Sequence, residues 1–344
     1  MNDYYIMGSS RLGRFIKNYL SEKNIGTFLG FLDNKLKGDT IYNPETIANK
    51  NAVVIIGSIN YMYEMKQQLI NLGYKNIITF AQLILKYPEL QNYNQAFDGL
   101  REDYENNKEK YEQLRNILAD EKSKEVLDTI IEFRETLNID LYSKIREDIN
   151  KQYFEDFMPK NTEIYVDGGA FDGDTVKRAL KYINPLKIYF FEPDETSLNK
   201  AKNSLKNLNN INYYPFGLSD KQKTLKFDAK GDFGSCFSNN GNVEIKCVSL
   251  DETIKEDKAF IKLDIEGAEI DALKGAERLL KNNSPFAVCV YHKPSDIWKI
   301  PELLLNVIYG KTLENCRGGG KKIFILRHYT NTVFETVLYG GFKT

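Results

Sequence analysis

The sequence predicts an α/β protein with two doubly wound units joined by a helical connector. Strand-like apolar runs alternate with helical patterns over residues 1–85 and again over residues 159–344, and both stretches open on a strand that ends in a glycine-rich turn. Between them, residues 86–158 carry few strand signals and repeat their apolar positions at helical spacing. A chain of 344 residues is long enough for each unit to bury its own core.

Composition excludes several classes of function. The formal net charge is −1, from 47 basic and 48 acidic residues, which argues against a nucleic-acid binder. Four scattered cysteines and two histidines form neither a zinc motif nor a disulfide framework. The first residues resemble a short strand rather than a signal peptide, and there is no run of 18 apolar residues. We therefore expect a cytoplasmic protein with small-molecule partners, without membrane or nucleic-acid partners, and with a homodimer as its expected assembly.

The first unit is expected to be a small sheet with a nucleotide-binding pattern. Its turn runs from Gly8 to Gly13, and Asp33 follows about 20 residues later, where a ribose-binding acid lies in a βαβ nucleotide fold. Either these residues hold a nucleotide or nucleotide-sugar, or the unit keeps this fold for packing or dimerisation. Its strands are expected at 4–7, 27–32, 52–56 and 76–80.

The connector contains aromatic residues close to the start of the second unit. They are Tyr142, Tyr153, Phe154 and Phe157, and we interpret them as packing against that unit rather than as a binding surface. Pro159 ends this segment.

The second unit opens with EIYVDGGAFDGDT at 163–175, an apolar strand followed by a glycine-rich turn and a helical pattern. Its spacing, D-x-G-x-x-x-G-x-T, differs from the dinucleotide fingerprint G-x-G-x-x-G. An acid at the strand end suits a ligand with an amino group and a sulfonium, so the pattern favours S-adenosylmethionine over NAD. The candidate cofactor residues of this turn are Asp167, Gly168, Gly169, Gly173, Asp174 and Thr175.

The next two strands end in further candidate cofactor contacts. The strand at 187–191 ends at Glu192-Pro193-Asp194, where Glu192 can accept hydrogen bonds from both ribose hydroxyls and Asp194 can cap the next helix. A strand at 211–216 leads to Ser219 and Asp220, which either flank the adenine or are ordinary turn residues.

Acidic residues gather after the strand at 259–263. Asp264, Glu266 and Glu269 would repel one another unless a positive group lies near: the sulfonium, Lys262, a helix N-terminus or a divalent cation. Glu269 fits equally well a second interpretation, in which it lies within the next helix on a solvated face.

His292 follows a strand at 286–290 and should project toward the acceptor as a general base of near-neutral pKa, with Asp264 as the alternative base. Asp264, Glu266 and His292 are thus the candidate catalytic residues. The same three, with Asp296 as a further candidate, could ligate Mg²⁺ or Mn²⁺.

The acceptor is expected to meet a loop and two side chains. A hairpin of 223–227 with 243–248 is predicted, and its connecting loop at 231–238 could act as a lid. The candidate acceptor contacts are Ser235, Asp296 and Lys262. A glycine-rich segment at 318–322 either touches a phosphate of a nucleotide-sugar or is a plain loop.

These segments together resemble the FkbM family of S-adenosylmethionine-dependent methyltransferases over about 185 residues. The matching segments are VDGGAFDGDT (166–175), FFEPD (190–194), GLSD (217–220), KLDIEGAE (262–269), YHKPSDIWKIP (291–301), KIFILRHYT (322–330) and ETVLYG (335–340). The resemblance implies a class I methyltransferase fold, with a seven-stranded sheet whose last strand is antiparallel, and O-methylation of a sugar or another hydroxylated product. The first unit resembles the nucleotide-binding-like domain found before sugar acyltransferases.

Two other functions remain open at this point. Two Rossmann-like units also suit an NAD-dependent sugar oxidoreductase, although neither turn carries its fingerprint. The third interpretation is a non-catalytic module that binds nucleotide-sugars.

Overall fold

The computed structural model describes residues 3–93, 96–228, 236–237, 243–316 and 323–341. The chain divides into two compact units, the first comprising 1–93 and 130–144 and the second 94–129 and 145–344. The helical segment expected between the units is therefore divided between them, and helix α5 (Glu121–Thr136) contributes to both.

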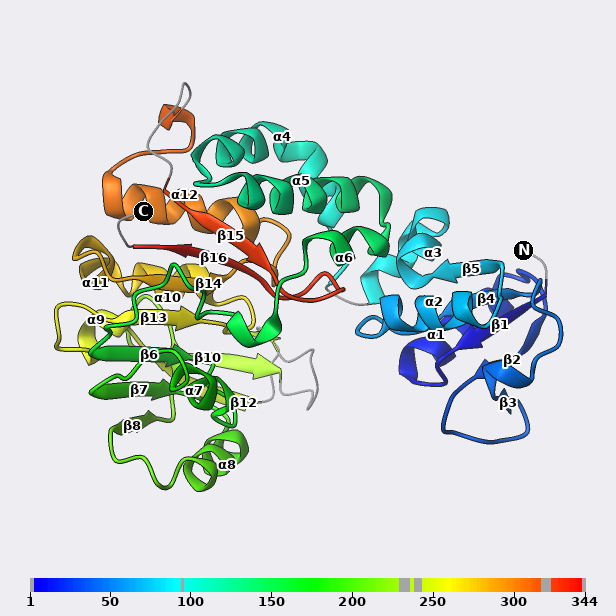
Figure 1. The fold of residues 1–344 in the computed structure, drawn as a ribbon, viewed down its shortest axis with the longest axis horizontal. Coiled ribbons are helices and arrows are strands. Elements are labelled where there is room, and N and C mark those ends of the chain that lie inside the picture. Colours follow the sequence, from blue (N-terminus) through cyan, green and yellow to red (C-terminus); the bar gives the residue numbers. More distant parts are fainter. Residues whose placement is uncertain (1–2, 94–95, 229–235, 238–242, 317–322, 342–344) are drawn as a thin grey trace. The chain divides into compact units, whose positions relative to one another are not determined.

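The first unit is a five-stranded parallel sheet in the order β3-β2-β1-β4-β5, seen from bottom to top on the right of Figure 1. Phe80, expected to end a strand, instead begins helix α3, because Thr79 and Gln82 form a reciprocal capping box at that point. The elements are β1 (Tyr4–Met7), α1 (Arg11–Glu22), β2 (Phe28–Leu32), β3 (Ile41–Tyr42), β4 (Val53–Ile56), α2 (Met62–Asn71), β5 (Asn76–Thr79) and α3 (Phe80–Lys86), with 3₁₀ helices at Pro44–Thr46, Pro88–Tyr93 and Ile139–Leu141.

The second unit contains a seven-stranded sheet in the order β15-β16-β14-β13-β6-β7-β8, which runs from top to bottom on the left of Figure 1. Strand β16 is antiparallel to both of its neighbours, and the other neighbouring pairs are parallel. This confirms the class I topology with an antiparallel last strand. The strands are β6 (Ile164–Gly168), β7 (Lys187–Phe191), β8 (Ile211–Tyr214), β13 (Phe260–Leu263), β14 (Phe286–Cys289), β15 (Ile325–His328) and β16 (Thr336–Gly340).

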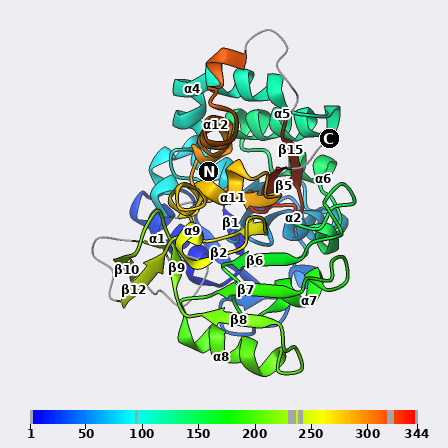
Figure 2. The ribbon, with the colours of Figure 1, turned by 90° about the vertical axis from the view of Figure 1, so that its left-hand side faces the viewer.

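A smaller sheet has the order β11-β10-β12-β9, and β10 and β12 form the predicted antiparallel hairpin. Its strands are β9 (Gly217–Leu218), β10 (Lys223–Asp228), β11 (Cys236–Phe237) and β12 (Val243–Val248). Gly217 and Leu218 pair with β12 in this sheet. Strand β8 was predicted to reach residue 216 but ends at Tyr214, just before Pro215, which has no backbone N–H to donate. In Figure 2, β6, β7 and β8 follow one another down the main sheet toward α8 (Glu195–Ser204).

Helices complete the second unit. α4 (Leu100–Ile117) contacts α12 (Asp296–Tyr309) through an ion pair between Lys110 and Glu302, whose nitrogen and oxygen lie 2.5 Å apart. The remaining helices are α7 (Asp174–Ala179), α9 (Leu250–Thr253), α10 (Glu269–Lys274) and α11 (Glu277–Lys281), with 3₁₀ helices at Ile149–Lys151 and Glu314–Cys316. Helix α6 (Tyr142–Ile145) lies at the boundary, with all but its last residue in the first unit. Among the described residues, no helix combines the length and apolarity needed to span a membrane.

The core of the second unit is aromatic. Phe154 stacks on Tyr182 and packs against Tyr165, and Phe157 packs against Tyr339. These two connector residues therefore pack as predicted. Tyr142 belongs to the first unit, where it packs against Phe133.

Candidate functional site

The glycine turn after β6 is held against the end of β13. Gly169 has φ +71°, and a Cβ built on it would lie 1.8 Å from the carbonyl oxygen of Asp264. The Asp264 N–H in turn donates to the carbonyl of Gly168 at 3.2 Å. Gly173, with φ +85°, packs against Leu205 just before α7 begins. The packing of two strand ends therefore already requires glycine here, before any ligand is considered.

Beneath the turn lies a buried ion pair. The Lys262 ammonium is 3.0 Å from an Asp167 oxygen, and the side chains are 1% and 0% exposed. Lys262 also donates to the carbonyl oxygens of Gly168 and Gly169, at 3.1 and 2.9 Å. Although burial would lower the pKa of Lys262, the Asp167 charge raises it, so this lysine stays charged. Lys262 was predicted to contact the acceptor. Its ammonium instead links β13 to the glycine turn through these hydrogen bonds.

Glu192 lies at the end of β7 and is only 8% exposed. One of its carboxylate oxygens accepts the Phe171 N–H at 2.9 Å and the other accepts the Asp194 N–H at 2.8 Å. Burial raises the pKa of Glu192 despite these bonds. Each oxygen has a second lone pair, so the carboxylate can still accept two hydroxyl donors.

Helix α8 begins shortly after Glu192, and helix α7 begins directly after Gly173. Asp194 caps α8 by accepting the Ser197 N–H at 2.7 Å, which confirms that role. Pro193 is half-buried between them, and Asp174 and Thr175 form the first turn of α7, where Asp174 is exposed and Thr175 is buried.

A polar network surrounds Asp264 at the end of β13. One of its oxygens accepts the Tyr153 hydroxyl at 2.9 Å, and the other accepts the Tyr291 hydroxyl at 3.1 Å and lies 3.3 Å from Nε2 of His292. Burial would raise the pKa of Asp264, but Lys262, His292 and the two hydroxyls outweigh it and lower that pKa. Asp264 is therefore a carboxylate held by several donors.

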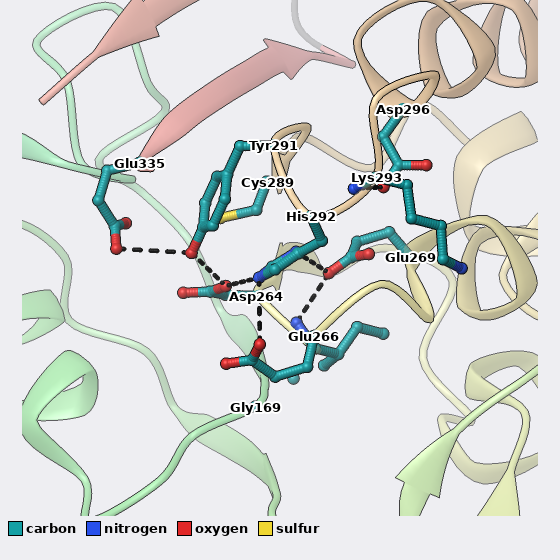
Figure 3. Close-up of polar contacts among 12 residues, drawn as sticks. Gly169, Asp264, Glu266, Glu269, Cys289, Tyr291, His292, Lys293, Asp296 and Glu335 are labelled. Atoms are coloured by element: carbon teal, nitrogen blue, oxygen red, sulfur yellow. Dashed lines mark hydrogen bonds and ion pairs between the residues drawn. The ribbon is translucent and has the colours of Figure 1, made fainter. Parts of the chain in front are cut away.

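His292 is the positive group among these acids (Figure 3). Its Nδ1 lies 2.9 Å from Glu269 and its Nε2 lies 3.8 Å from Glu266, in addition to the Asp264 contact. Burial would lower the pKa of His292, but Glu269, Asp264 and Glu266 raise it to about 10. The predicted general base is thus already protonated at neutral pH, so the structure does not support that role. The positively charged imidazole of His292 offsets the repulsion expected among Asp264, Glu266 and Glu269.

Glu266 and Glu269 point in different directions. Glu266 has φ +54° and its side chain is 52% exposed, whereas Glu269 begins α10 with its side chain fully buried. Glu269 does lie in the helix, but not on a solvated face. Burial and Asp264 raise the pKa of Glu266, although His292 lowers it in part.

The close ligating groups differ from the predicted metal set. Among the described residues, two triads have ligating atoms within 4.8 Å of one another: Asp264, Glu269 and His292, and Asp264, Cys289 and Glu335. Glu266 belongs to neither, although one of its carboxylate oxygens lies 3.8 Å from Nε2 of His292. In the first triad each ring nitrogen of His292 already faces a carboxylate, which suits an imidazolium better than a metal ligand.

Two other predicted residues are buried. Asp296 is 1% exposed and accepts the Lys293 N–H at 3.0 Å near the start of α12, and burial together with Glu269 raises its pKa to about 7. Ser219 is fully buried and donates to Asp220, which is paired with Lys223, while its N–H donates to the Val248 carbonyl, so its contact with the adenine stays a prediction. Ser235 and residues 318–322 lie outside the described residues.

Sequence reasoning missed part of the network. Tyr153 was assigned to packing alone, yet its hydroxyl reaches Asp264, and Tyr291 and Glu335 lie in motif segments without having received a role. Glu335 is close to the Tyr291 hydroxyl at 3.4 Å and accepts a hydrogen bond from Gln152. The one available signal was that Tyr291 and His292 directly follow the strand that ends beside Asp264.

In the first unit, the residues of the nucleotide-binding pattern contact other residues of the same chain. A Cβ on Gly13 would lie 1.9 Å from the Gly8 carbonyl oxygen, so helix packing requires that glycine. Asp33 accepts the N–H groups of Lys35 and Leu36 and the hydroxyl of Ser9. Close chain packing and a local turn therefore account for these residues.

In the second unit, strand order brings the site together. β6 lies between β13 and β7, so Asp264 and Glu192 end up on opposite sides of the glycine turn at the carboxyl edge of the sheet. The chain leaves β6 toward β7 and later returns on the other side, and such a switch point is where open α/β sheets bind ligands. A buried glutamate that accepts two backbone N–H groups lies on one side of this point, and a hydrogen-bonded acid cluster lies on the other.

Comparisons with known proteins agree with this arrangement. Residues 167–312 match the family model of the methyltransferase FkbM domain. The structure of a methyltransferase FkbM from Methylobacillus flagellatus KT aligns with 98% of this chain and 89% of its own, at 20% identity and a TM-score of 0.76. Two further structures align more weakly, each with a TM-score of 0.31. An rRNA methylase from Streptococcus thermophilus is 15% identical, and the alignment covers 60% of this chain and 93% of that one. Aeropyrum pernix fibrillarin is 12% identical, and the alignment covers 52% of this chain and 66% of that one. Among curated proteins no match was found. Residues 167–312 of the second unit are therefore similar to the methyltransferase FkbM domain, and the chain shares its fold with the methyltransferase FkbM from Methylobacillus flagellatus KT.

Proposed function

We propose that this chain transfers the methyl group of S-adenosylmethionine to a hydroxyl of a sugar or nucleotide-sugar used in surface polysaccharide or natural-product synthesis. The observation that carries the proposal is the placement of Glu192 and Asp264 on opposite sides of one glycine turn, at the ends of β7 and β13. This placement suits an adenosine on one side and an acceptor on the other.

The donors and acceptors of the site fit the adenosine half of that cofactor. Two backbone N–H groups hold Glu192 in a single orientation, and its free lone pairs match the two adjacent hydroxyls of a ribose. The turn itself is held rigidly, since Lys262 bonds two of its carbonyls and Gly169 touches the Asp264 carbonyl. A rigid turn lowers the ordering cost of binding.

S-adenosylmethionine would supply an electrophilic methyl group. During transfer the carbon–sulfur bond breaks with its electron pair left on sulfur, a carbon–oxygen bond forms, and the hydroxyl proton passes to a base. Asp264 is a weak base, because several donors lower its pKa. Glu266 has a raised pKa and a half-exposed carboxylate, so it is the better proton acceptor. His292, which carries a charge, fixes the positions of Asp264 and Glu269.

The acceptor class rests on the chemistry of this edge and on the family. Carboxylates accept hydrogen bonds from sugar hydroxyls, and the FkbM resemblance implies O-methylation. A metal is not needed to balance the charge among the acids, because His292 faces three of them.

Cofactor binding is the first test. Calorimetry with S-adenosylhomocysteine should show binding to the wild type and loss of binding in Glu192→Ala, because the ribose loses its acceptor. Glu195→Ala, an exposed position in the first turn of α8, is the matched control and should bind normally. Undiminished affinity in Glu192→Ala would remove this assignment, and binding of NAD instead would favour an oxidoreductase.

Turnover is the second test. Transfer of labelled methyl should be measured on a panel of nucleotide-sugars and simple glycosides. Glu266→Gln and Asp264→Asn should reduce turnover by roughly 10²-fold or more while S-adenosylhomocysteine still binds. Asp257→Asn, whose side chain is 93% exposed, is the matched control. Normal turnover in Glu266→Gln would exclude it as the base, and activity lost on chelation with EDTA would favour a metal.

A further inference from the structure

Glu335 lies in an unusual backbone conformation beside the candidate site. Its φ is +71°, a left-handed value that is strained for a non-glycine residue, and it directly precedes β16. Such strain persists where surrounding contacts over-determine it, which is common at functional sites. Here the carboxylate is held by Gln152 and lies 3.4 Å from the Tyr291 hydroxyl.

The carboxylates of Glu335 and Asp264 are close to each other. A carboxylate oxygen of each, together with the Cys289 sulfur, falls within a span of 4.8 Å, and Figure 3 shows Tyr291 between the two acids. Burial and the Asp264 charge raise the pKa of Glu335 to about 7. Above pH 7 the pair therefore carries two negative charges beside the position proposed for methyl transfer.

Tyr291 cannot satisfy both acids at once. Its hydroxyl lies 3.1 Å from Asp264 and 3.4 Å from Glu335, yet a phenol has a single O–H to donate. One of the two facing carboxylate oxygens therefore lacks that donor at any moment, and a hydroxyl on a ligand can supply one.

The remaining charges around the pair do not favour an anion. Lys262 is already paired with Asp167, and His292 faces Asp264, Glu266 and Glu269. An incoming carboxylate or phosphate would meet Glu335 and Asp264 without a free cation among these groups, and the repulsion between like charges disfavours its binding.

We propose that Glu335 is a specificity-determining residue that, together with Asp264, binds a neutral hydroxyl-bearing ring and rejects an acceptor that is anionic at this position. The inference rests on the proposed methyltransferase function and names its acceptor class. The diphosphate of a nucleotide-sugar acceptor would then extend away from the Asp264–Glu335 pair.

The test uses matched pairs of acceptors. Labelled methyl transfer is measured at about pH 8.5, where Glu335 is charged, to the methyl glycosides of glucose, galactose and mannose and to the corresponding methyl glycosiduronic acids. The wild type should methylate a neutral member and prefer it to its uronic acid by at least about tenfold. Glu335→Gln should narrow that ratio by about tenfold through better use of the uronic acid, because it removes the repelling charge.

Two further variants make the result decisive. Glu335→Asn also removes the charge and suits a left-handed backbone better than glutamate, so it should fold and narrow the ratio too. Glu277→Gln, a half-exposed position on α11, should leave the ratio unchanged. Thermal melting and S-adenosylhomocysteine binding check that each variant retains its fold and cofactor site.

The outcomes separate the two proposals. Three outcomes would each overturn the role of Glu335. The wild type could use uronic acids as well as neutral glycosides or better, or the ratio could be unchanged in both Glu335 variants. The third outcome is that no neutral glycoside is methylated although S-adenosylhomocysteine binds. Failure of the wild type to bind S-adenosylhomocysteine would instead overturn the proposed function itself.

Discussion

The charge of His292 is open to a direct measurement, because the chain has only two histidines and their surroundings shift them in opposite directions. Carboxylates around His292 raise its pKa from 6.5 to about 10. His328 is fully buried, and burial lowers its pKa to about 3. Between pH 5.5 and 8.5 we therefore expect one permanently charged and one permanently neutral imidazole.

The shift also predicts a pH-dependent contribution to stability. A rise from 6.5 to about 10 corresponds, at about 1.4 kcal/mol per unit, to at most about 5 kcal/mol. Because the pKa is raised in the folded state, this stabilisation is fully present below pH 6.5 and is lost as the pH rises toward 10. His292→Gln should accordingly be less stable than the wild type by a margin that shrinks between those values.

The assay is NMR of protein labelled with ¹³C and ¹⁵N at histidine, titrated in the presence of EDTA. The spectrum of His292→Gln identifies the missing signal. Ring shifts of His292 should be those of an imidazolium throughout the range. A midpoint between pH 6 and 7 for His292 would refute the reasoning and would restore it as a candidate base.

Three further predictions concern the scaffold of the site. Gly169→Ala should lower the free energy of unfolding in urea by at least about 3 kcal/mol, because its Cβ would meet the Asp264 carbonyl. The control is Gly310→Ala, at a residue that is also left-handed (φ +62°) but lies in open space, and it should lower that free energy by only about 1 kcal/mol. Equal losses in the two variants would contradict the clash. Asp194→Ala should cost about 1 kcal/mol of stability through the lost helix cap, measured the same way, and no change would argue against the cap. Lys262→Met should destabilise the protein by about 3–5 kcal/mol by leaving Asp167 buried and unpaired, and a double variant with Asp167→Leu should recover much of it; no recovery would mean that the ion pair is not the cause.

Much of the fold could be predicted from local pattern. The strands at 187–191 and 243–248 match their predicted bounds, and the hairpin of β10 and β12 forms as expected. Boundaries failed where a local contact competed with the apolar pattern. The capping box at Thr79 ended β5 early, and Pro215, which has no backbone N–H, ended β8 two residues before its predicted end.

The sequence predicted individual residues of the candidate site, but it did not predict which of them contact one another. Asp264, Glu192 and His292 were identified because each directly follows an apolar strand. Tyr153 and Glu335 were not, because they lie 111 and 71 residues from Asp264 in the chain, and no spacing rule links such distant positions. Their approach follows from the order of strands in the sheet and from left-handed backbone at both residues.

The sequence by itself determined the fold class, the glycine turn and the residue types at the strand ends, because these depend on neighbours a few positions apart. Only the tertiary structure decided their charges and directions. It placed His292 between carboxylates, which makes a predicted base a fixed cation, and it turned Lys262 inward to Asp167. The physical reason is that a pKa depends on burial and on charges within a few ångströms, and residues far apart in the sequence supply both.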